Sequence, residues 1–330
     1  NSLAEFAKSL SQISHFDPIS VGPGGANSGI TMRNLSVSLL MFAVTATVPA
    51  YGEGREVLGY GRLFTNDYFG DNEDRWRTGG YVISQVRGAG WDGSRPASAG
   101  ALMEYRLRTE IIAPSPGTAD RPYSGVLSFG AHSHYTASSV DVSVGADIVA
   151  IGPGTGVSDF QEWFHGAVGA PTPTGIDTQL GDSVHFGATV EVSRSYQMSE
   201  AVTFRPFIEA QAGVEEILRV GADVMIGRAG QRDMLLRDVV TGQLYRGIEG
   251  DDSGLNFLIG ADYALVGDSA YLPADMGYAA TDNRTRLRAG VHWQMFEDTS
   301  FFYGMTYLSE EFVGQTEGQL LGSLKLNFNF

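Results

Sequence analysis

The residues with the clearest chemical potential lie in the stretch 64–80, which reads F-T-N-D-Y-F-G-D-N-E-D-R-W-R-T-G-G. Asn66 and Asp67 come at the end of one alternating segment, and Thr78 comes at the start of the next. A β-hairpin would bring the two ends together, so that an amide, a carboxylate and a hydroxyl meet at one rim of the fold. The alternative is an ordinary turn, because Asn and Asp are favoured in turns for conformational reasons.

A second polar cluster lies in the loop 152–184, where S-D-F-Q-E-W-F-H begins at Ser158. Ser158 followed three residues later by Gln161 resembles a capping box, which predicts a short helix over about 159–168. Gln161 and His165 are then i and i+4, so they share one face of that helix. Two alternatives stay open: His165 has a purely structural role, or Gln161 only caps the helix.

Composition excludes several classes of protein. The chain has 330 residues, a formal net charge of −16 and no cysteine. The acidic balance argues against a nucleic-acid partner, because phosphates need Lys and Arg. Without cysteine there is no disulfide framework and no thiolate metal site. The sequence contains no Rossmann fingerprint, P-loop or H-E-x-x-H helix. Its 43 glycines and 11% aromatic residues suit one large all-β domain, or two small ones, with many tight turns.

An export signal is expected near the start of the chain. Residues 32–50 begin with Met and a single Arg, continue with an apolar run over 35–44 and end in V-P-A. This order is typical of a secretory signal peptide cleaved after its last residue. The alternative is a short buried helix, because the run falls short of the roughly 20 apolar residues that span a bilayer. We expect 1–31 to be a non-native leader and 51–330 to be the mature domain.

Segments of about ten residues with period-two alternation recur through the mature chain. In the last one, Leu324 and Leu326 fall on one face, whereas Ser323, Lys325 and Asn327 fall on the other. We expect twelve such strands, at 57–66, 78–87, 104–113, 125–136, 139–151, 185–196, 202–213, 216–227, 255–266, 284–295, 299–312 and 319–330.

The fold class that we predict is all-β, a transmembrane antiparallel β-barrel of about twelve strands with a short helix in an extracellular loop. A soluble sandwich would show the same alternation with the polar face in water. The signal peptide, the aromatic C-terminal residue Phe330 and the aromatic residues near strand ends favour the membrane barrel. The loops expected at the outer end are 67–78, 114–124, 152–184, 267–283 and 313–318.

This strand count has two consequences. It makes 228–254 a long periplasmic connection, which is unusual for such barrels. It also brings seven polar residues to the outer end, namely Asn66, Asp67, Thr78, Asp120, Arg121, Gln161 and His165.

The remaining histidines are expected inside the barrel. His132 and His134 lie two apart on one strand and face the same side. They could be members of an interior network or a metal pair, although no third ligand lies nearby in sequence. His185 and His292 are expected to face the lumen.

Several of these pieces resemble the outer-membrane lipid A 3′-O-deacylase family. The combination of N-D, T-G-G and Q-x-x-x-H is the specific part of this resemblance, and the C-terminal half matches only as alternating strands. The matching segments are N-D at 66–67, D-R-W-R-T-G-G at 74–80, D-R-P-Y-S-G at 120–125, I-G-P-G-T-G at 151–156, Q-E-W-F-H at 161–165 and I-D-T-Q-L at 176–180.

The resemblance implies a calcium-dependent hydrolase that removes the 3′-linked acyloxyacyl group from lipid A, the anchor of lipopolysaccharide. It implies a location in the bacterial outer membrane, with the site facing the cell exterior. His165 matches the base that activates water, and Gln161 matches a helix residue facing the same pocket. Asn66, Asp67 and Thr78 match residues around the calcium site, and their oxygens are of the hard type that Ca²⁺ prefers.

The resemblance is incomplete where the substrate would be held. No basic residue in 114–120 aligns with the one that some members offer to the substrate, and Pro171 and Pro173 replace an acidic residue and a tyrosine. These departures concern phosphate contacts and acyl-chain preference rather than ester chemistry. Arg121 is our candidate for binding a lipid phosphate, because guanidinium groups contact phosphates in bidentate fashion.

Three other classes of protein remain as alternatives. A passive outer-membrane pore or structural barrel would conduct ions steadily and would not need calcium. A barrel phospholipase with a serine nucleophile would be labelled covalently by a fluorophosphonate. A soluble secreted β-sandwich would partition into buffer without detergent.

Overall fold

The structure is a computed structural model that describes residues 54–228, 231–250, 254–296 and 299–328. The predicted leader (1–31), the predicted signal peptide (32–50) and the first three residues of the predicted mature domain lie outside the described residues. Within the described ranges, no helix is both long enough and apolar enough to cross a membrane.

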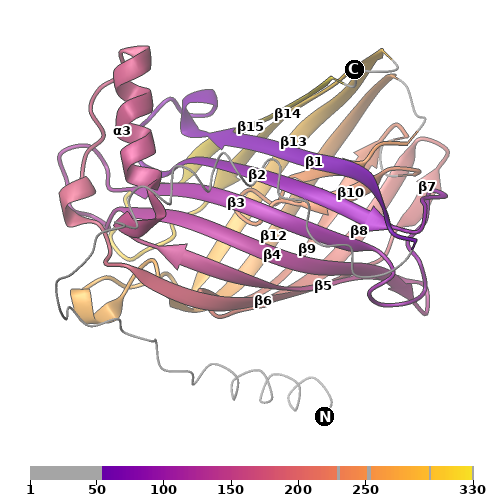
Figure 1. Ribbon diagram of the computed structural model, residues 1–330, viewed down its shortest axis with the longest axis horizontal. Helices are drawn as coiled ribbons and strands as arrows, with labels where there is room; N and C mark the ends of the chain where they lie inside the picture. The colour runs from indigo at the N-terminus through magenta and orange to yellow at the C-terminus, as the bar shows by residue number, and fades with distance from the viewer. Residues whose placement is uncertain (1–53, 229–230, 251–253, 297–298, 329–330) are drawn as a thin grey trace, which may run out of the picture.

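Twelve long antiparallel strands form a closed barrel (Figure 1). Neighbouring strands follow chain order, and the pairings of β1 with β15 and of β6 with β8 close the cylinder. The predicted fold class and all twelve predicted strands are therefore confirmed. The barrel strands are β1 (Glu56–Asn66), β2 (Trp76–Gly88), β3 (Met103–Ala113), β4 (Ser124–Ala137), β5 (Val140–Ile151), β6 (Ser183–Ser193), β8 (Val202–Ala212), β9 (Glu215–Ile226), β12 (Gly254–Ser269), β13 (Asn283–Phe296), β14 (Thr299–Leu308) and β15 (Gln319–Phe328), and a short extra strand, β7 (Tyr196–Ser199), pairs with β8.

The alternation along the strands places apolar side chains outside and polar side chains inside. In β12, Leu255, Ile259 and Leu265 are more than half exposed, whereas Asn256 and Asp262 are buried. A soluble sandwich buries its apolar face, so this inverted pattern is that of a barrel whose outer wall faces lipid.

The predicted outer loops do gather at one end of the barrel, which we call the rim. Figure 1 shows the single α-helix of the described residues, α3 (Val157–Val168), lying across the strand direction at this end. Four 3₁₀ turns lie in the rim loops, namely η1 (Asp67–Phe69), η2 (Pro153–Thr155), η3 (Ile176–Thr178) and η4 (Ala274–Met276).

The segment predicted as a long periplasmic connection does join β9 to β12 at the end opposite the rim, but it folds back into the barrel. Its strands β10 (Met234–Arg237) and β11 (Leu244–Ile248) pair as a hairpin, which we call the lumen hairpin. Every residue of both strands is buried. Because all its sides meet the barrel wall or its own partner strand, this hairpin has no polar face that alternation could reveal.

The lumen hairpin can approach the barrel wall closely because glycines lie at the points of contact. A Cβ atom added to Gly59 in β1 would lie 2.3 Å from the carbonyl oxygen of Gly247. One added to Gly304 in β14 would lie 2.7 Å from the side chain of Gln243. Gln243 Nε2 donates to the carbonyl oxygens of Ala289 and Met305, at 3.1 and 3.0 Å. The hairpin thus packs on the backbone of the wall.

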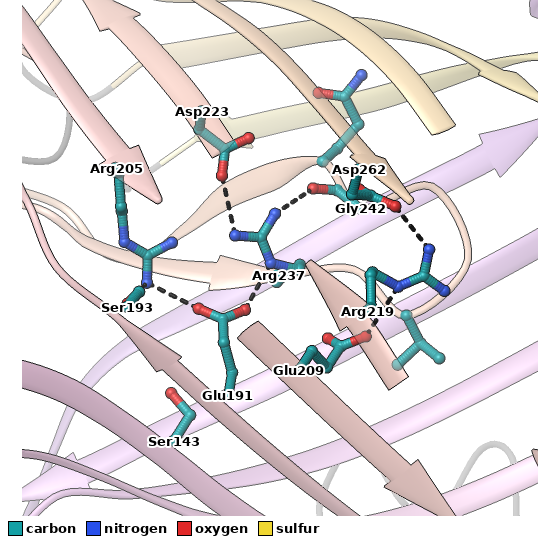
Figure 2. A network of polar contacts seen from close by, with 12 residues as sticks. Ser143, Glu191, Ser193, Arg205, Glu209, Arg219, Asp223, Arg237, Gly242 and Asp262 are labelled. Atoms are coloured by element: carbon teal, nitrogen blue, oxygen red, sulfur yellow. Dashed lines mark hydrogen bonds and ion pairs between the residues drawn. The ribbon is translucent and has the colours of Figure 1, made fainter. Parts of the chain in front are cut away.

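Buried ion pairs hold the hairpin in place. Figure 2 shows Arg237 of β10 between Glu191 of β6 and Asp223 of β9, with distances of 2.5 and 2.9 Å. The Arg237 guanidinium also lies 3.7 Å from the centre of the Phe207 ring. A charge in the lumen is stable only when it is paired in this way, because desolvation of an isolated ion costs several kcal/mol.

We expect Arg237→Met to lower the free energy of unfolding by about 3 kcal/mol, because it leaves two buried carboxylates short of a partner. Urea unfolding in detergent, followed by tryptophan fluorescence, measures the change. The matched control is Arg194→Met, an exposed arginine between β6 and β7, which should change stability by about 0.5 kcal/mol or less. Equal stability of the two variants would show that the lumen hairpin is not held by this pair.

Candidate active site

The side chain of Asn66 links the end of β1 to the start of β2, and these two strand ends meet as the predicted hairpin requires. Its Oδ1 accepts from the backbone N–H of Tyr68 at 2.9 Å, which caps η1. Its Nδ2 donates to the backbone carbonyl of Thr78 at 2.8 Å. One side chain therefore fixes both the loop and the start of the returning strand.

A β-bulge explains why the Thr78 carbonyl is available to Asn66. The register between β2 and β3 shifts between Arg77 and Gly79, so Thr78 has no partner residue in β3. Bulges of this kind re-aim side chains and are common beside active sites. Gly79 leaves room for Asn66, because a Cβ atom there would lie 3.2 Å from Asn66 Nδ2.

Arg77, the residue before Thr78, points into the lumen. Its guanidinium lies 2.5 Å from Glu110, 3.0 Å from Glu311 and 3.4 Å from Glu215. These carboxylates come from β3, from the β14–β15 loop and from β9. The buried cluster ties three distant parts of the rim to the residue before Thr78, and it borders a cavity of about 80 Å³ above the turn of the lumen hairpin.

Asp67 is a buried carboxylate in an acidic loop. Its side chain is only 3% exposed, and Oδ2 accepts from the backbone N–H of Arg75 at 3.1 Å. Burial raises the pKa of Asp67 to about 8; the charges of Asp74 and Asp71 add to the rise, and the N–H of Arg75 opposes it. A carboxylate held like this needs either a proton or a cation.

Helix α3 carries the second polar cluster and starts two residues earlier than predicted. The predicted capping box is wrong: Gly156, in a left-handed conformation, is the N-cap, and no side chain caps the helix. Ser158 and Gln161 lie on the buried face instead. Gln161 Oε1 accepts from the Tyr123 hydroxyl at 2.8 Å, so Gln161 does not cap the helix.

The start of α3 docks directly on the barrel wall. A Cβ atom added to Gly125 of β4 would lie 3.0 Å from Thr155 Oγ1 and 3.1 Å from Val157 Cβ. The glycine therefore lets the helix approach the backbone of β4, which fixes the position of Gln161 one turn further along.

His165 lies one turn after Gln161 and is half-buried. Its Nδ1 lies 2.6 Å from the carbonyl oxygen of Pro171. A carbonyl can only accept, so Nδ1 carries the hydrogen, and Nε2 of the neutral ring keeps a free lone pair. Gly169 ends the helix in a left-handed conformation and turns the chain so that Pro171 returns to the ring. The carbonyl of Pro171 thus supplies the partner of the imidazole.

The helix half and the hairpin half of the site are positioned separately. Within the described ranges, no hydrogen bond or ion pair joins Gln161 or His165 to Asn66, Asp67 or Thr78. The helix contacts β3 and β4, whereas the hairpin is built on β1 and β2. In the part of the chain that the structure describes, no group of three His, Cys, Asp or Glu side chains could hold a metal ion.

Arg121 lies inside the rim rather than on its surface. It is 1% exposed, and Nη1 donates to Glu311 at 2.9 Å. Its guanidinium lies over the Phe312 ring, and Nε and Nη2 have no hydrogen-bond partner. The neighbouring Asp120 accepts from Trp76 Nε1 at 2.9 Å and braces the loop. Arg121 could reach a lipid phosphate only if Glu311 and its loop moved.

His132, His134 and His292 belong to interior networks. His134 lies 2.8 Å from Ser143 Oγ and 2.9 Å from Glu104, and His132 lies 3.3 Å from Asp147. The prediction that His292 faces the lumen is confirmed, because its Nε2 bonds to the Leu244 carbonyl of the lumen hairpin.

Fold and alternation define a β-barrel protein of the outer-membrane class. A family described as "Outer membrane protein LpxR" matches residues 35–330. The chain therefore belongs to this family, which agrees with the resemblance of its motifs and with a location in the outer membrane.

The chain is similar to a solved structure of LpxR from Salmonella typhimurium, with a TM-score of 0.67 and 18% identity over 82% of this chain and 100% of that one. At this identity the likeness shows the fold alone. Weaker matches are the β domain of the Bordetella autotransporter BrkA (TM-score 0.41, 11% identity, 84% and 100% covered) and the porin NanC (0.39, 8%, 82% and 100%). Those TM-scores support no inference. A comparison with curated proteins gave no match.

We expect the neutral ring of His165 to be the Nδ1–H tautomer, because the Pro171 carbonyl accepts from that atom. Nitrogen-15 NMR of histidine-labelled protein in detergent, recorded where the ring is neutral, distinguishes the two tautomers. Loss of the signal in His165→Gln assigns it. An Nε2–H tautomer at this position would contradict the hydrogen bond to Pro171.

Proposed function

We propose that the chain is a calcium-dependent lipid A 3′-O-deacylase, which hydrolyses the 3′-linked acyloxyacyl ester in the outer leaflet with His165 as the general base. Family membership and the motif resemblance support the substrate class. The observation that carries the chemistry is the hydrogen bond from His165 Nδ1 to Pro171, because it leaves Nε2 free to take a proton from water.

The hairpin residues fit a calcium ion by the chemistry of their donors. Asp67 offers a buried carboxylate with a raised pKa, which is a group that gains from a cation. Asn66 precedes Asp67 in the chain and donates to the Thr78 carbonyl, so these residues offer amide and carbonyl oxygens, and Ca²⁺ takes mixed carboxylate, amide and carbonyl ligands. A bound Ca²⁺ would polarise the ester carbonyl and stabilise the oxyanion.

Side chains and backbone groups of the protein transfer the proton, stabilise the imidazolium and donate a hydrogen bond. His165 takes the proton of the attacking water at Nε2, and the Pro171 carbonyl then stabilises the imidazolium through Nδ1–H. Gln161 uses Oε1 to bind Tyr123, so its NH₂ group is the one left to donate to water or substrate.

We also propose that the rim faces the cell exterior. The longest connection between barrel strands, 152–182, lies at the rim with helix α3, and barrels of this class keep their longer loops outside. Of the arginines near the site, Arg75 lies closer to solvent than Arg121 and pairs with the exposed Glu317 at 2.9 Å. Arg75 could therefore exchange its partner for a phosphate without opening the rim.

Replacing His165 with Ala should lower the rate of 3′ deacylation by about 10²–10⁴-fold, because the general base is lost. Lipid A extracted from cells that express each variant and analysed by mass spectrometry gives the readout. His185→Ala removes a histidine that bonds to Ser183 and should leave activity intact. Undiminished loss of the 3′ acyl group in the His165 variant would rule out this base.

Calcium should raise the resistance of the wild type to urea, whereas Asp67→Asn should lose most of this response because the charged ligand is gone. Since calcium must displace the proton of Asp67, the stabilisation should grow as pH rises toward 8. Asp177→Asn, at an exposed position in η3, is the control and should respond like the wild type. A calcium response unchanged in the Asp67 variant would place the ion elsewhere.

A further inference from the structure

Helix α3 has an aromatic face that neither the barrel nor the proposed chemistry uses. Phe160, Trp163 and Phe164 are 47%, 65% and 46% exposed. At 100° per residue they span an arc of about 100° on the helix surface. The charged residues Asp159 and Glu162 lie outside this arc.

The three rings form a ready-made patch. The centre of the Phe160 ring lies 5.7 Å from that of Trp163 and 6.2 Å from that of Phe164. Facing water, these rings would forgo the burial that makes aromatic side chains stabilising. An exposed aromatic patch at the end of the barrel therefore indicates a surface that contacts another apolar phase or molecule.

The start of α3 packs on Gly125 of β4, which lies in the same outward-facing row as Phe129, so the helix lies next to the apolar outer wall of the barrel. Phe64 points outward from β1, in the row of side chains that faces lipid, and its ring packs on Phe69 with a centre distance of 6.0 Å. Tyr68, 70% exposed, extends this group along η1. Aromatic side chains gather where barrels of this class meet the membrane surface, so the rim carries such a belt.

The direction of the helix suits the same surface. Figure 1 shows α3 lying across the strands at the rim, and thus along the membrane plane rather than through it. Amphipathic helices that lie in this plane bury an aromatic and aliphatic face in the boundary between headgroups and acyl chains. The buried face of α3, with Val157 and Gln161, holds it to the barrel on another side.

We propose that the aromatic face of α3 is a membrane-contact surface whose occupant is the acyl layer of the surrounding outer leaflet. The face then anchors the rim helix laterally, beside the wall that β3 and β4 form. This contact does not depend on the proposed activity, because it uses side chains other than Gln161 and His165.

The absence of cysteine makes a direct test simple. Nitroxide labels are attached to Trp163→Cys and, as the matched control one residue away, to Glu162→Cys. Phe186→Cys, at a 71% exposed position on the outer face of β6, gives the lipid reference. Each variant is reconstituted in phosphatidylcholine vesicles, and its heat-modifiable migration in gels confirms a folded barrel.

Electron paramagnetic resonance then compares collisions with oxygen, which dissolves in lipid, and with a water-soluble nickel chelate. The oxygen-to-nickel ratio at position 163 should approach that at 186 and exceed that at 162 by about fivefold. Equal ratios at 162 and 163 would overturn the proposal. So would spin–spin broadening at 163 that grows with protein density, which would mean that a second copy covers the face.

Discussion

The rest of the rim depends on a single bulge in β2, which leaves Thr78 without a partner residue in β3. Arg77 enters the lumen among three glutamates, whereas the next residue, Thr78, turns its carbonyl to Asn66. The inner cluster resists disruption because breaking a buried ion pair is costly. Because Arg77 is held in place, the neighbouring Thr78 carbonyl is also held in place for its hydrogen bond with Asn66. The buried ion pairs therefore fix the hairpin half of the site from within the barrel.

The lumen needs the same kind of pairing along its whole length. Polar strand faces point inward, and the lumen hairpin brings Arg237 to carboxylates that two wall strands present. Among the described residues, the lumen around the hairpin is filled by paired charges, by close backbone contacts and by an apolar cluster that includes Leu63, Val86 and Leu236. Apolar side chains also cover the outer wall, where lipid is the solvent.

The parts that were predicted from sequence are those governed by a repeating physical rule. Twelve barrel strands have one lipid-facing side, so alternation located them, and their up-and-down order brought Asp67 and His165 to the same end. The lumen hairpin was not predicted, because a segment buried on every side shows no alternation of polar and apolar residues. The false capping box at Ser158 arose because a glycine conformation, not a side chain, starts α3. The Pro171 carbonyl and the burial of Arg121 depend on loop packing, which leaves no local sequence pattern.

We propose that the hairpin and the helix, which are positioned separately, serve one site around a cation. Manganese, which shares the preference of calcium for oxygen ligands, broadens NMR signals of nearby protons. Titrating Mn²⁺ into the protein and following the His165 imidazole protons tests the claim most directly. We expect these signals to broaden in the wild type and to stay sharp in Asp67→Asn. An unaffected His165 signal in a wild-type protein that binds Mn²⁺ would show that the two halves do not form one site.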